Sequence, residues 1–334
     1  MAKADHIVNV GIFAASSIVP EIEFRAGVEH LKRSGFAPRV QPQVSDQWFM
    51  FPGSDEDRAQ SIYELASDDS VDVLWAARGG YGAGRLLPLL ERITAARGVP
   101  AKKKLLVGYS DVTVLHEFVR TRWGWSTLHA PMPAASNFAK LDEKEWRAIV
   151  DYVRGVAADA PWQHAQLAWM EGARPRPFPI RAELIGGNLS LWAALAGTPW
   201  QPSAAGKIVF LEDVDEAYYR IDRMMVQLEQ AGMLNGAAAI VLGDFTDCHD
   251  ENNTCRASET GDERKPLRKV FEQSEAWPHL FDRVARATGV PIATGLPVGH
   301  GPHYAPLPLG ARYELSPDGK LKLLEWDWLR SAVT

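Results

Sequence analysis

The chain has 334 residues, 46% of them hydrophobic and 23% charged, which is enough for about two domains whose cores need neither disulfides nor a metal. Its net charge of −6 argues against a nucleic-acid-binding protein, because that function usually needs a basic face. Two cysteines, Cys248 and Cys255, are too few for a disulfide framework and favour a reducing, cytoplasmic compartment. No apolar run approaches the ~20 residues of a membrane span, and the first 13 residues do not read as a signal peptide.

The first half of the chain alternates short apolar runs with amphipathic stretches. Ser54 and Asp57 have the spacing of a variant capping box, with Asp in place of Glu. Because the apolar runs are almost continuous and alternate with helical patterns, we expect a mostly parallel sheet covered by helices on both faces. Strands are predicted at 6–15, 71–77 and 104–109, and helices at 20–34, 54–66 and 112–119.

The second half is richer in Pro, Trp and short strands. We expect an N-terminal α/β domain (1–160), a Trp- and Pro-rich linker (161–180) and a smaller, β-rich, barrel-like α+β domain (181–334). Helices are predicted at 142–154 and 219–232, strands at 207–211, 237–243, 311–315 and 320–326, and a polar loop at 244–263.

A glycine-rich segment, residues 78–85 (RGGYGAGR), follows the second predicted strand. Glycines allow a tight turn that presents backbone N–H groups at a helix N-terminus, where negative charge is stabilised. The segment is not a P-loop, because Arg85 and Leu86 replace the Lys-Ser/Thr pair, and Arg85 also replaces the last glycine of G-x-G-x-x-G. An ordinary turn is the alternative, but four glycines in six positions favour a loop that binds an anion or an oxyanion.

Ser110 and Asp111 follow the third predicted strand, in the sequence Gly-Tyr-Ser-Asp. A serine at a turn from strand to helix is typical of a nucleophile elbow, although Val112 replaces the closing glycine of G-x-S-x-G. The alternative is that Ser110 or Asp111 only caps the next helix. Neighbouring parallel strands would bring this turn and the glycine-rich segment to one crevice, which favours a functional role.

Two further positions carry groups that could complete such a site. Glu212 is the first polar residue after an apolar strand, where a partly buried carboxylate needs a partner such as an imidazolium. His300 has glycines on both sides and can reach a partner from another domain. The alternatives are a solvated acidic loop for Glu212 and a simply exposed side chain for His300.

Metal and cofactor sites are not predicted. His116 and Glu117 lack the second histidine of an H-E-x-x-H zinc site, and Cys248 and Cys255 have the wrong spacing for a zinc finger. The twelve tryptophans are expected to pack in the core and at interfaces.

Taken together, these segments resemble the LD-carboxypeptidase family of serine peptidases, which includes muramoyltetrapeptide carboxypeptidases and microcin-immunity peptidases. The resemblance covers almost the whole chain. It rests on five segments in the order of the family: ARGGYGAGRLLP, VGYSDVT, LIGGNLSLWAAL, FLEDVDEAYYRIDRMMVQLEQAG and LPVGHGPHYAPLPLGARYEL.

The resemblance implies a Ser-His-Glu triad in a site between two domains. Ser110 corresponds to the nucleophile, His300 to the general base and Glu212 to the residue that orients the histidine. The backbone N–H groups of Asp111 and of the Gly79–Gly80 turn correspond to the oxyanion hole.

The resemblance also implies the substrate, the amide between an L-centre and a C-terminal D-amino acid of a murein peptide. The terminal carboxylate of that substrate needs local donors, and the candidates are Arg78, Arg85 and Asn188 of a Gly-Gly-Asn turn at 186–188. The family further implies a cytoplasmic homodimer without a cofactor, a nucleic-acid partner or a membrane partner.

Two alternatives stay open. An immunity-type peptidase that cleaves a peptidyl-nucleotide would need aromatic stacking, for which Trp162, Trp169 or Trp200 could serve. A non-catalytic module could use the glycine-rich segment to bind phosphate. The sequence also departs from the family, because Ser16 and Ser17 stand where relatives usually carry a proline and the 248–265 loop is long.

Overall fold

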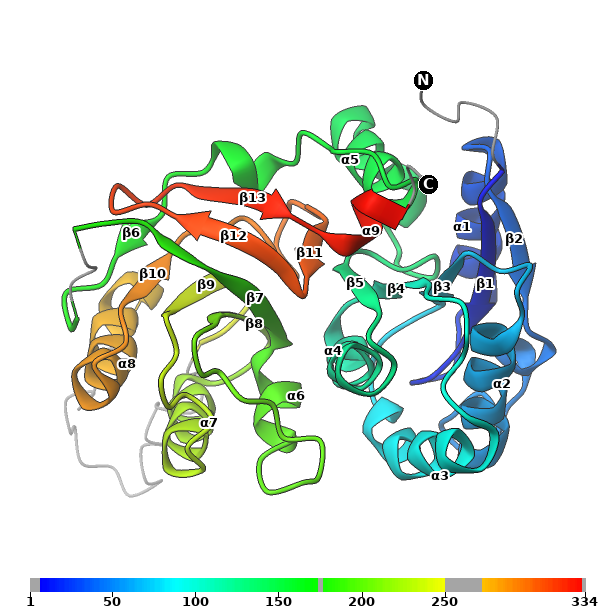
Figure 1. Ribbon diagram of the computed structural model, residues 1–334, viewed down its shortest axis with the longest axis horizontal. Coiled ribbons are helices and arrows are strands. Elements are labelled where there is room, and N and C mark those ends of the chain that lie inside the picture. The colour runs from blue at the N-terminus through cyan, green and yellow to red at the C-terminus, as the bar shows by residue number, and fades with distance from the viewer. Residues whose placement is uncertain (1–6, 174–176, 250–271, 332–334) are drawn as a thin grey trace, which may run out of the picture.

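The computed structural model describes residues 7–173, 177–249 and 272–331, and within them two sheets lie side by side (Figure 1). One hydrophobic cluster contains Val10 and Leu128 of the first sheet together with Leu184 and Phe210 of the second. The two halves of the chain therefore pack on a shared core. The expected fold class, a mostly parallel α/β sheet with helices followed by a β-rich second sheet, is confirmed.

The first sheet has the strand order β11-β5-β4-β3-β1-β2 in the described part of the chain. Its strands are parallel except β11, which pairs antiparallel with β5. The strands are β1 (Asn9–Phe13), β2 (Ala37–Val40), β3 (Val73–Ala76), β4 (Leu105–Gly108), β5 (Ser126–His129) and β11 (Leu307–Leu309). The helices around it are α1 (Glu21–Arg33), α2 (Asp55–Ser67), α3 (Leu87–Arg97), α4 (Thr113–Phe118) and α5 (Glu143–Val153).

The second sheet has the order β13-β12-β7-β8-β9-β10-β6, with four parallel strands in the middle and antiparallel strands at its ends. Helices α6, α7 and α8 gather on one side of it (Figure 1). The strands are β6 (Ala168–Trp169), β7 (Ile180–Asn188), β8 (Ile208–Val214), β9 (Ala239–Thr246), β10 (Ile292–Thr294), β12 (Ala311–Leu315) and β13 (Leu321–Glu325). The helices are α6 (Leu189–Ala194), α7 (Tyr218–Gln230), α8 (Gln273–Thr288) and α9 (Asp327–Ser331).

Short helical turns complete the elements. They are the 3₁₀ turns η1 (Pro42–Ser45), η2 (Ala83–Leu86), η3 (Ser110–Val112), η5 (Phe138–Lys140) and η6 (Pro161–His164), and the π-helical turn η4 (Val119–Trp123). Two of them, η2 and η3, begin in the glycine-rich segment and at Ser110, so both turns lie between a strand of the first sheet and the helix that follows it.

Local sequence signals explain much of this architecture. Every residue of β3 and β4 is buried, which agrees with central parallel strands covered on both faces. Helix α2 begins at the expected capping box: the Ser54 hydroxyl accepts the Asp57 N–H at 3.1 Å, and the Asp57 carboxylate accepts the Ser54 N–H at 3.2 Å. Two orphan donors of the first helical turn are thus satisfied.

The Gly-Gly-Asn turn expected at 186–188 is wrong, because these residues end strand β7. They pair in parallel register with Phe210, Leu211 and Glu212 of β8. A side chain at Gly186 would meet the Phe210 carbonyl, so the glycine permits close approach of the two strands instead of a turn.

The predicted division into two domains stays a prediction. Strand β6 lies inside the expected 161–180 linker, and β11 carries a piece of the C-terminal segment into the first sheet. Of the expected 248–265 loop, residues 250–265 lie outside the described residues, and Cys255 with them.

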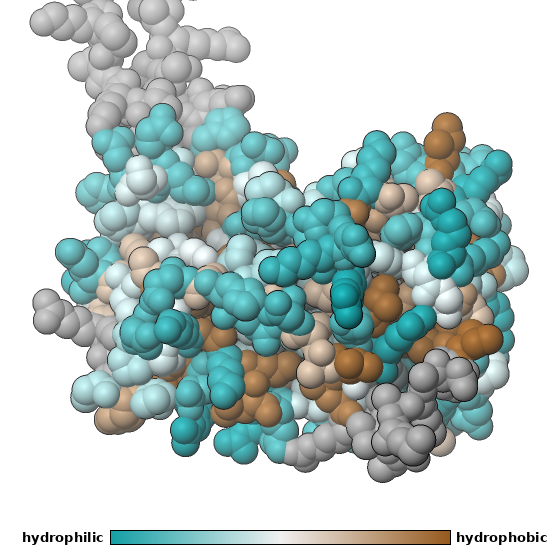
Figure 2. All heavy atoms as spheres, turned by 90° about the horizontal axis from the view of Figure 1, so that it is seen from above, coloured by the Kyte–Doolittle hydropathy of each residue, from teal (hydrophilic) through white to brown (hydrophobic). Residues whose placement is uncertain are grey.

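The described helices include none with the length and apolar character needed to cross a bilayer. The face seen from above is mostly hydrophilic, and apolar side chains form only small groups on it (Figure 2). Most large apolar side chains of the described residues are instead buried in three hydrophobic clusters.

Candidate active site

Ser110 stands at the sharp turn that follows β4. Its φ of +61° is in the left-handed region, which a residue other than glycine adopts only where the surroundings enforce it. Neither Ser110 nor Asp111 caps a helix through its side chain, because η3 has Tyr109 and α4 has Val112 at the N-cap, both without a side-chain bond. The capping alternative is therefore wrong, and a serine in the left-handed conformation between a strand and a helix has a geometry typical of a nucleophile elbow.

The glycine-rich segment lies directly against this turn. A Cβ atom at Gly79 would be 3.1 Å from the Ser110 Cβ and 3.2 Å from its Oγ. Gly80 has a φ of +109°, and a side chain there would collide with Ser17. Gly79 thus brings the loop backbone close to Ser110, and Gly80 is held against Ser17 in a conformation that favours glycine. Backbone amides close to the hydroxyl are what an oxyanion hole requires.

Two serines that follow β1 hold the turns in place. The Ser16 hydroxyl donates to the Asp111 carboxylate at 2.6 Å, and the Ala83 N–H donates to the same oxygen at 2.8 Å. The Ser17 hydroxyl accepts the Tyr81 N–H at 3.2 Å. Ser16 and Ser17 thus bind the other two turns of the site.

Glu212 and His300 form a buried pair. The Glu212 carboxylate, fully buried near the end of β8, lies 2.7 Å from Nδ1 of His300 in the loop between β10 and β11. Burial alone would raise the pKa of Glu212, but His300 and His129 lower it to about 2. Burial alone would lower the pKa of His300, but Glu212 outweighs it and the pKa is raised.

The backbone explains why these two groups can meet. Gly299 has a φ of +143°, and a Cβ atom there would be 3.0 Å from Oε2 of Glu212. Glycine at this position therefore lets the loop bring the imidazole of His300 onto the carboxylate. The Tyr109 ring packs against the imidazole with 4.7 Å between centroids, which limits its movement.

Sequence reasoning missed a second histidine at this carboxylate. His129, at the end of β5 and only 2% exposed, places Nε2 3.8 Å from the other carboxylate oxygen of Glu212. Its ring is edge-on to Tyr109 with 5.6 Å between centroids. The strand that carries it, 126–129, was not predicted, so no signal pointed to the histidine.

A pocket of about 380 Å³ opens beside these groups, and both Ser110 and His300 line it. The charged side chains at its wall are Arg78 and Glu23, and the Arg78 guanidinium donates to the Ile18 carbonyl at 2.5 Å. The remaining lining residues are Pro20, Gly79, Gly80, Tyr109, Met132, Ala134, Ala135, Ser136, Asn137 and Tyr304.

Two residues expected to bind the substrate carboxylate are engaged elsewhere. Arg85 pairs with Asp55 at 2.6 Å and is not among the residues that line the pocket. Asn188 is buried, donates to Asp213 at 2.9 Å and caps α6 through its side-chain oxygen. Of the three candidates, the pocket therefore contains only Arg78.

No group of three or more His, Cys, Asp or Glu residues in the described part of the chain is arranged to hold a metal ion. His116, which the sequence excluded as a zinc ligand, is fully buried and places Nε2 3.0 Å from the Gly108 carbonyl. Burial lowers its pKa to about 3, so at neutral pH the uncharged ring donates to the end of β4. His116 thus supports the turn that carries Ser110.

The arrangement has the parts of nucleophilic acyl chemistry. A hydroxyl on a strained turn shares a pocket with an imidazole, and the far nitrogen of that imidazole is held by a buried carboxylate. Backbone next to the hydroxyl is free of side chains at Gly79 and Gly80, where amide donors can face a developing negative charge.

Comparison with known proteins identifies similar chains. The N-terminal domain of LD-carboxypeptidases matches residues 10–130, and their C-terminal domain matches residues 181–315. The murein tetrapeptide carboxypeptidase of Pseudomonas aeruginosa is 30% identical over 337 residues, which cover 96% of this chain and 94% of the relative.

Comparison with solved structures also identifies a similar protein. The muramoyltetrapeptide carboxypeptidase of Oxalobacter formigenes is 28% identical with a TM-score of 0.71, covering 95% of this chain and 98% of its own. In sequence, the chain is also similar to the microcin C7 self-immunity protein of Escherichia coli, with 24% identity over 93% of this chain and 91% of the relative.

Proposed function

This chain belongs to the LD-carboxypeptidase family, and from that premise we propose that it is a serine peptidase with the catalytic triad Ser110, His300 and Glu212. The observation that carries the proposal is the 2.7 Å contact between Glu212 and Nδ1 of His300, in the pocket that Ser110 also lines. With Nδ1–H donated to the carboxylate, Nε2 of His300 is left as the base.

The reaction proceeds through an acyl-enzyme. Ser110 Oγ attacks the scissile carbonyl while its proton passes to Nε2 of His300, and the carbonyl oxygen becomes an oxyanion. The C–N bond then breaks, and His300 returns the proton to the leaving amine. Water repeats the sequence on the ester, so the peptide acid is released and the serine is regenerated.

The backbone N–H groups of Asp111 and of Gly79 or Gly80 bind the oxyanion. The support for this is the close approach of Gly79 to Ser110, where an added Cβ atom would be only 3.2 Å from the reacting hydroxyl. Loss of one such donor typically lowers the rate by ~10²–10³.

The proposed substrate is a murein tetrapeptide, cleaved between its L-centre and the terminal D-amino acid. The name of the P. aeruginosa relative supports the substrate. Arg78 is the cation at the pocket wall, and we assign it the terminal carboxylate of the leaving residue. The expected cytoplasmic location and homodimer stay predictions, as do the binding roles of Arg85 and Asn188.

The immunity-type alternative has less support from the pocket. Trp162 is fully buried, Trp169 donates to the Pro317 carbonyl and Trp200 donates to Glu91, and none of the three lines the pocket beside Ser110. The aromatic stacking that a nucleotide would need is therefore not offered there by these side chains.

Mass spectrometry of a tetrapeptide incubated with the enzyme tests the proposal. Two substrates that differ only in the configuration of the terminal alanine are compared, together with the Ser110→Ala variant. We expect release of D-alanine by the wild type, no release of L-alanine, and no release of either by Ser110→Ala. Activity that persists in Ser110→Ala would refute the serine mechanism, and cleavage of a peptidyl-nucleotide alone would favour the immunity-type alternative.

A further inference from the structure

The Asp111 carboxylate has no role in the reaction proposed above, which uses only the backbone N–H of this residue. The carboxylate is nevertheless buried, with 1% of the residue exposed. One of its oxygens accepts both the Ser16 hydroxyl at 2.6 Å and the Ala83 N–H at 2.8 Å. It therefore binds the turn after β1 and the glycine-rich segment after β3 to the turn of Ser110 after β4.

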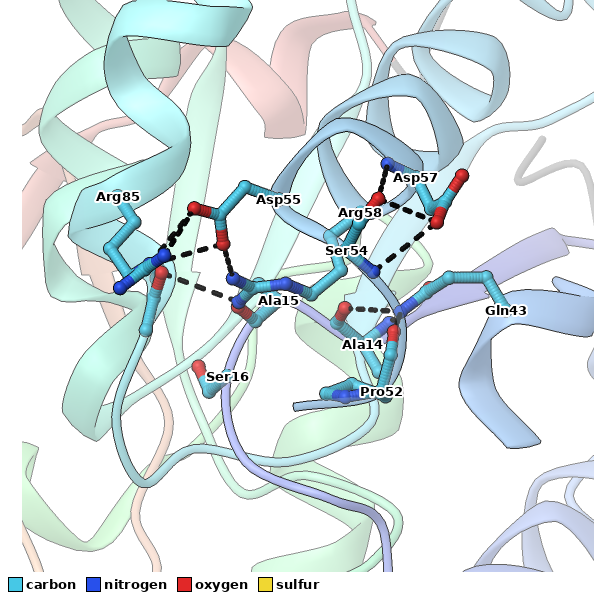
Figure 3. A network of polar contacts seen from close by, with 12 residues as sticks. Ala14, Ala15, Ser16, Gln43, Pro52, Ser54, Asp55, Asp57, Arg58 and Arg85 are labelled. Atoms are coloured by element: carbon cyan, nitrogen blue, oxygen red, sulfur yellow. Dashed lines mark hydrogen bonds and ion pairs between the residues drawn. The ribbon is translucent and has the colours of Figure 1, made fainter. Parts of the chain in front are cut away.

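A buried cation binds two of the same turns. Arg58 of α2 is fully buried and donates to the Ala15 carbonyl and, at 3.3 Å, to the Gly82 carbonyl. Its guanidinium also pairs with Asp55, which in turn binds Arg85 at the end of the glycine-rich segment (Figure 3). Figure 3 shows Arg58 reaching from α2 to the backbone of the loop that contains Ala15 and Ser16.

Burying the Asp111 carboxylate and the Arg58 guanidinium costs free energy, so each needs compensating contacts where it lies. An ionised side chain removed from water must be compensated by charge-assisted hydrogen bonds. The Asp111 carboxylate is compensated by the Ser16 hydroxyl and the Ala83 N–H, which belong to the other two turns. Arg58 pairs with Asp55 of its own helix, and its bonds to the Ala15 and Gly82 carbonyls join the same two turns. The bonds to the turns are available only while the turns keep their spacing. The buried side chains of Asp111 and Arg58 therefore hold the turns at a fixed spacing, because they would lose these hydrogen bonds if the turns moved apart.

The spacing matters because two oxyanion donors come from two of these turns. Asp111 follows Ser110, whereas Gly79 and Gly80 belong to the loop after β3. Ala83, which Asp111 binds, is three residues beyond Gly80. Preorganised donors must be held within ~0.5 Å of the productive position to retain their effect.

We propose that the Asp111 carboxylate, with Ser16 and Arg58, is a positioning device that fixes the distance between the two halves of the oxyanion hole. The inference rests on the proposed function. It assigns the three side chains an effect on the transition state and none on substrate binding.

The test compares Ser16→Ala, Asp111→Ala and Asp111→Asn with the wild type. The measured quantities are kcat, KM and the inhibition constant of a tripeptide aldehyde, whose adduct with the serine carries the oxyanion. Ser70→Ala is the matched control, because Ser70 donates to Asp68 at 2.6 Å in an equivalent but exposed serine–aspartate bond.

For Asp111→Ala we expect kcat to fall by ~10²–10³ with KM within about twofold, and the aldehyde to bind weaker by a similar factor. Asp111→Asn keeps an acceptor oxygen, so its kcat should be at least tenfold higher than that of Asp111→Ala. Ser16→Ala, which removes one bond of the network, should lie between the wild type and Asp111→Ala, and Ser70→Ala should equal the wild type.

An unchanged aldehyde inhibition constant in both Ser16→Ala and Asp111→Ala overturns the positioning role, even if less enzyme is folded, because a partly unfolded sample lowers the number of active sites and not their affinity. If Asp111→Ala does not fold, Ser16→Ala decides by the same criterion. A wild type that neither cleaves the tetrapeptide nor binds the aldehyde refutes the proposed function itself, and with it this inference.

Discussion

Replacement of Glu212 by Gln tests the triad with the least change in shape. The carboxylate is fully buried and its Oε2 is 2.7 Å from Nδ1 of His300. A glutamine fills the same space but carries no charge. Where its amide nitrogen faces Nδ1, the imidazole must place its proton on Nε2, and the ring can then no longer accept the proton of Ser110.

The magnitude follows from that geometry. The equivalent carboxamide replacement in a Ser-His-Asp triad lowers kcat by ~10⁴, which corresponds to about 5.5 kcal/mol of transition-state stabilisation at about 1.4 kcal/mol per factor of ten. Because the change leaves the pocket wall untouched, we expect kcat to carry the loss and KM to stay within about threefold.

The assay is tetrapeptide hydrolysis followed by mass spectrometry over a range of pH. Glu29→Gln is the control, since Glu29 pairs with Lys32 on the exposed face of α1 and does not line the pocket. The control should have the activity of the wild type. A loss of less than tenfold in Glu212→Gln, with the fold intact, would refute the assignment of this carboxylate as the residue that orients His300.

The remaining predictions concern pH and the two turns. Because Glu212 raises the pKa of His300 above its ordinary value of 6.5, kcat/KM should rise with pH through a value above 6.5, and a pKa at or below 6.5 in an NMR titration of the ring would contradict this. The associated contribution to stability is complete below pH 6.5 and is lost as pH rises through the raised pKa, so denaturant unfolding should show Glu212→Gln gaining on the wild type over that range. Ser110→Gly and Ser110→Ala should both be inactive, but the glycine variant should be more stable by about 1 kcal/mol, because glycine tolerates the φ of +61°; equal unfolding midpoints would argue against strain at the turn. Gly80→Ala should lower kcat by at least about tenfold, whereas Gly84→Ala, with open space around the added methyl, should not; equal activity of the two would remove the glycine-rich segment from the site.

The sequence predicted correctly those elements that are determined by residues close together in the chain. The capping box at Ser54 and Asp57 begins α2 as expected, because its bonds lie within one helical turn. The apolar runs at 71–77 and 104–109 contain β3 and β4. Strands that are buried on both faces consist almost entirely of apolar residues, so the run itself predicts the strand.

Parts of the fold that depend on distant residues were not predictable in this way. Strand β11 looks like a loop because it has three residues and a proline, and only pairing with β5 makes it a strand. Helix α8 contains Pro278, which the sequence rules treat as a helix breaker, but packing of Trp277 and Phe281 in the core compensates.

In the candidate site, too, some features were predictable from sequence patterns and others depend on contacts between distant segments. The resemblance to the family predicted that Ser110 and His300 share a site, because both lie in segments with the family's sequence pattern, and both residues line one pocket. The ion pair of Arg85 with Asp55 and the position of His129 beside Glu212 join segments far apart in the chain, and neither leaves a pattern in the local sequence.

Ser110 is proposed to form a covalent acyl-enzyme, and trapping this intermediate tests the serine mechanism most directly. Rapid acid quench of the enzyme with an excess of tetrapeptide, followed by intact-mass and peptide mapping, should show the mass of the tripeptide acyl group on the peptide that contains Ser110, and no such adduct in Ser110→Ala. Turnover of the substrate with no adduct on Ser110, or with an adduct on another residue, would contradict the account.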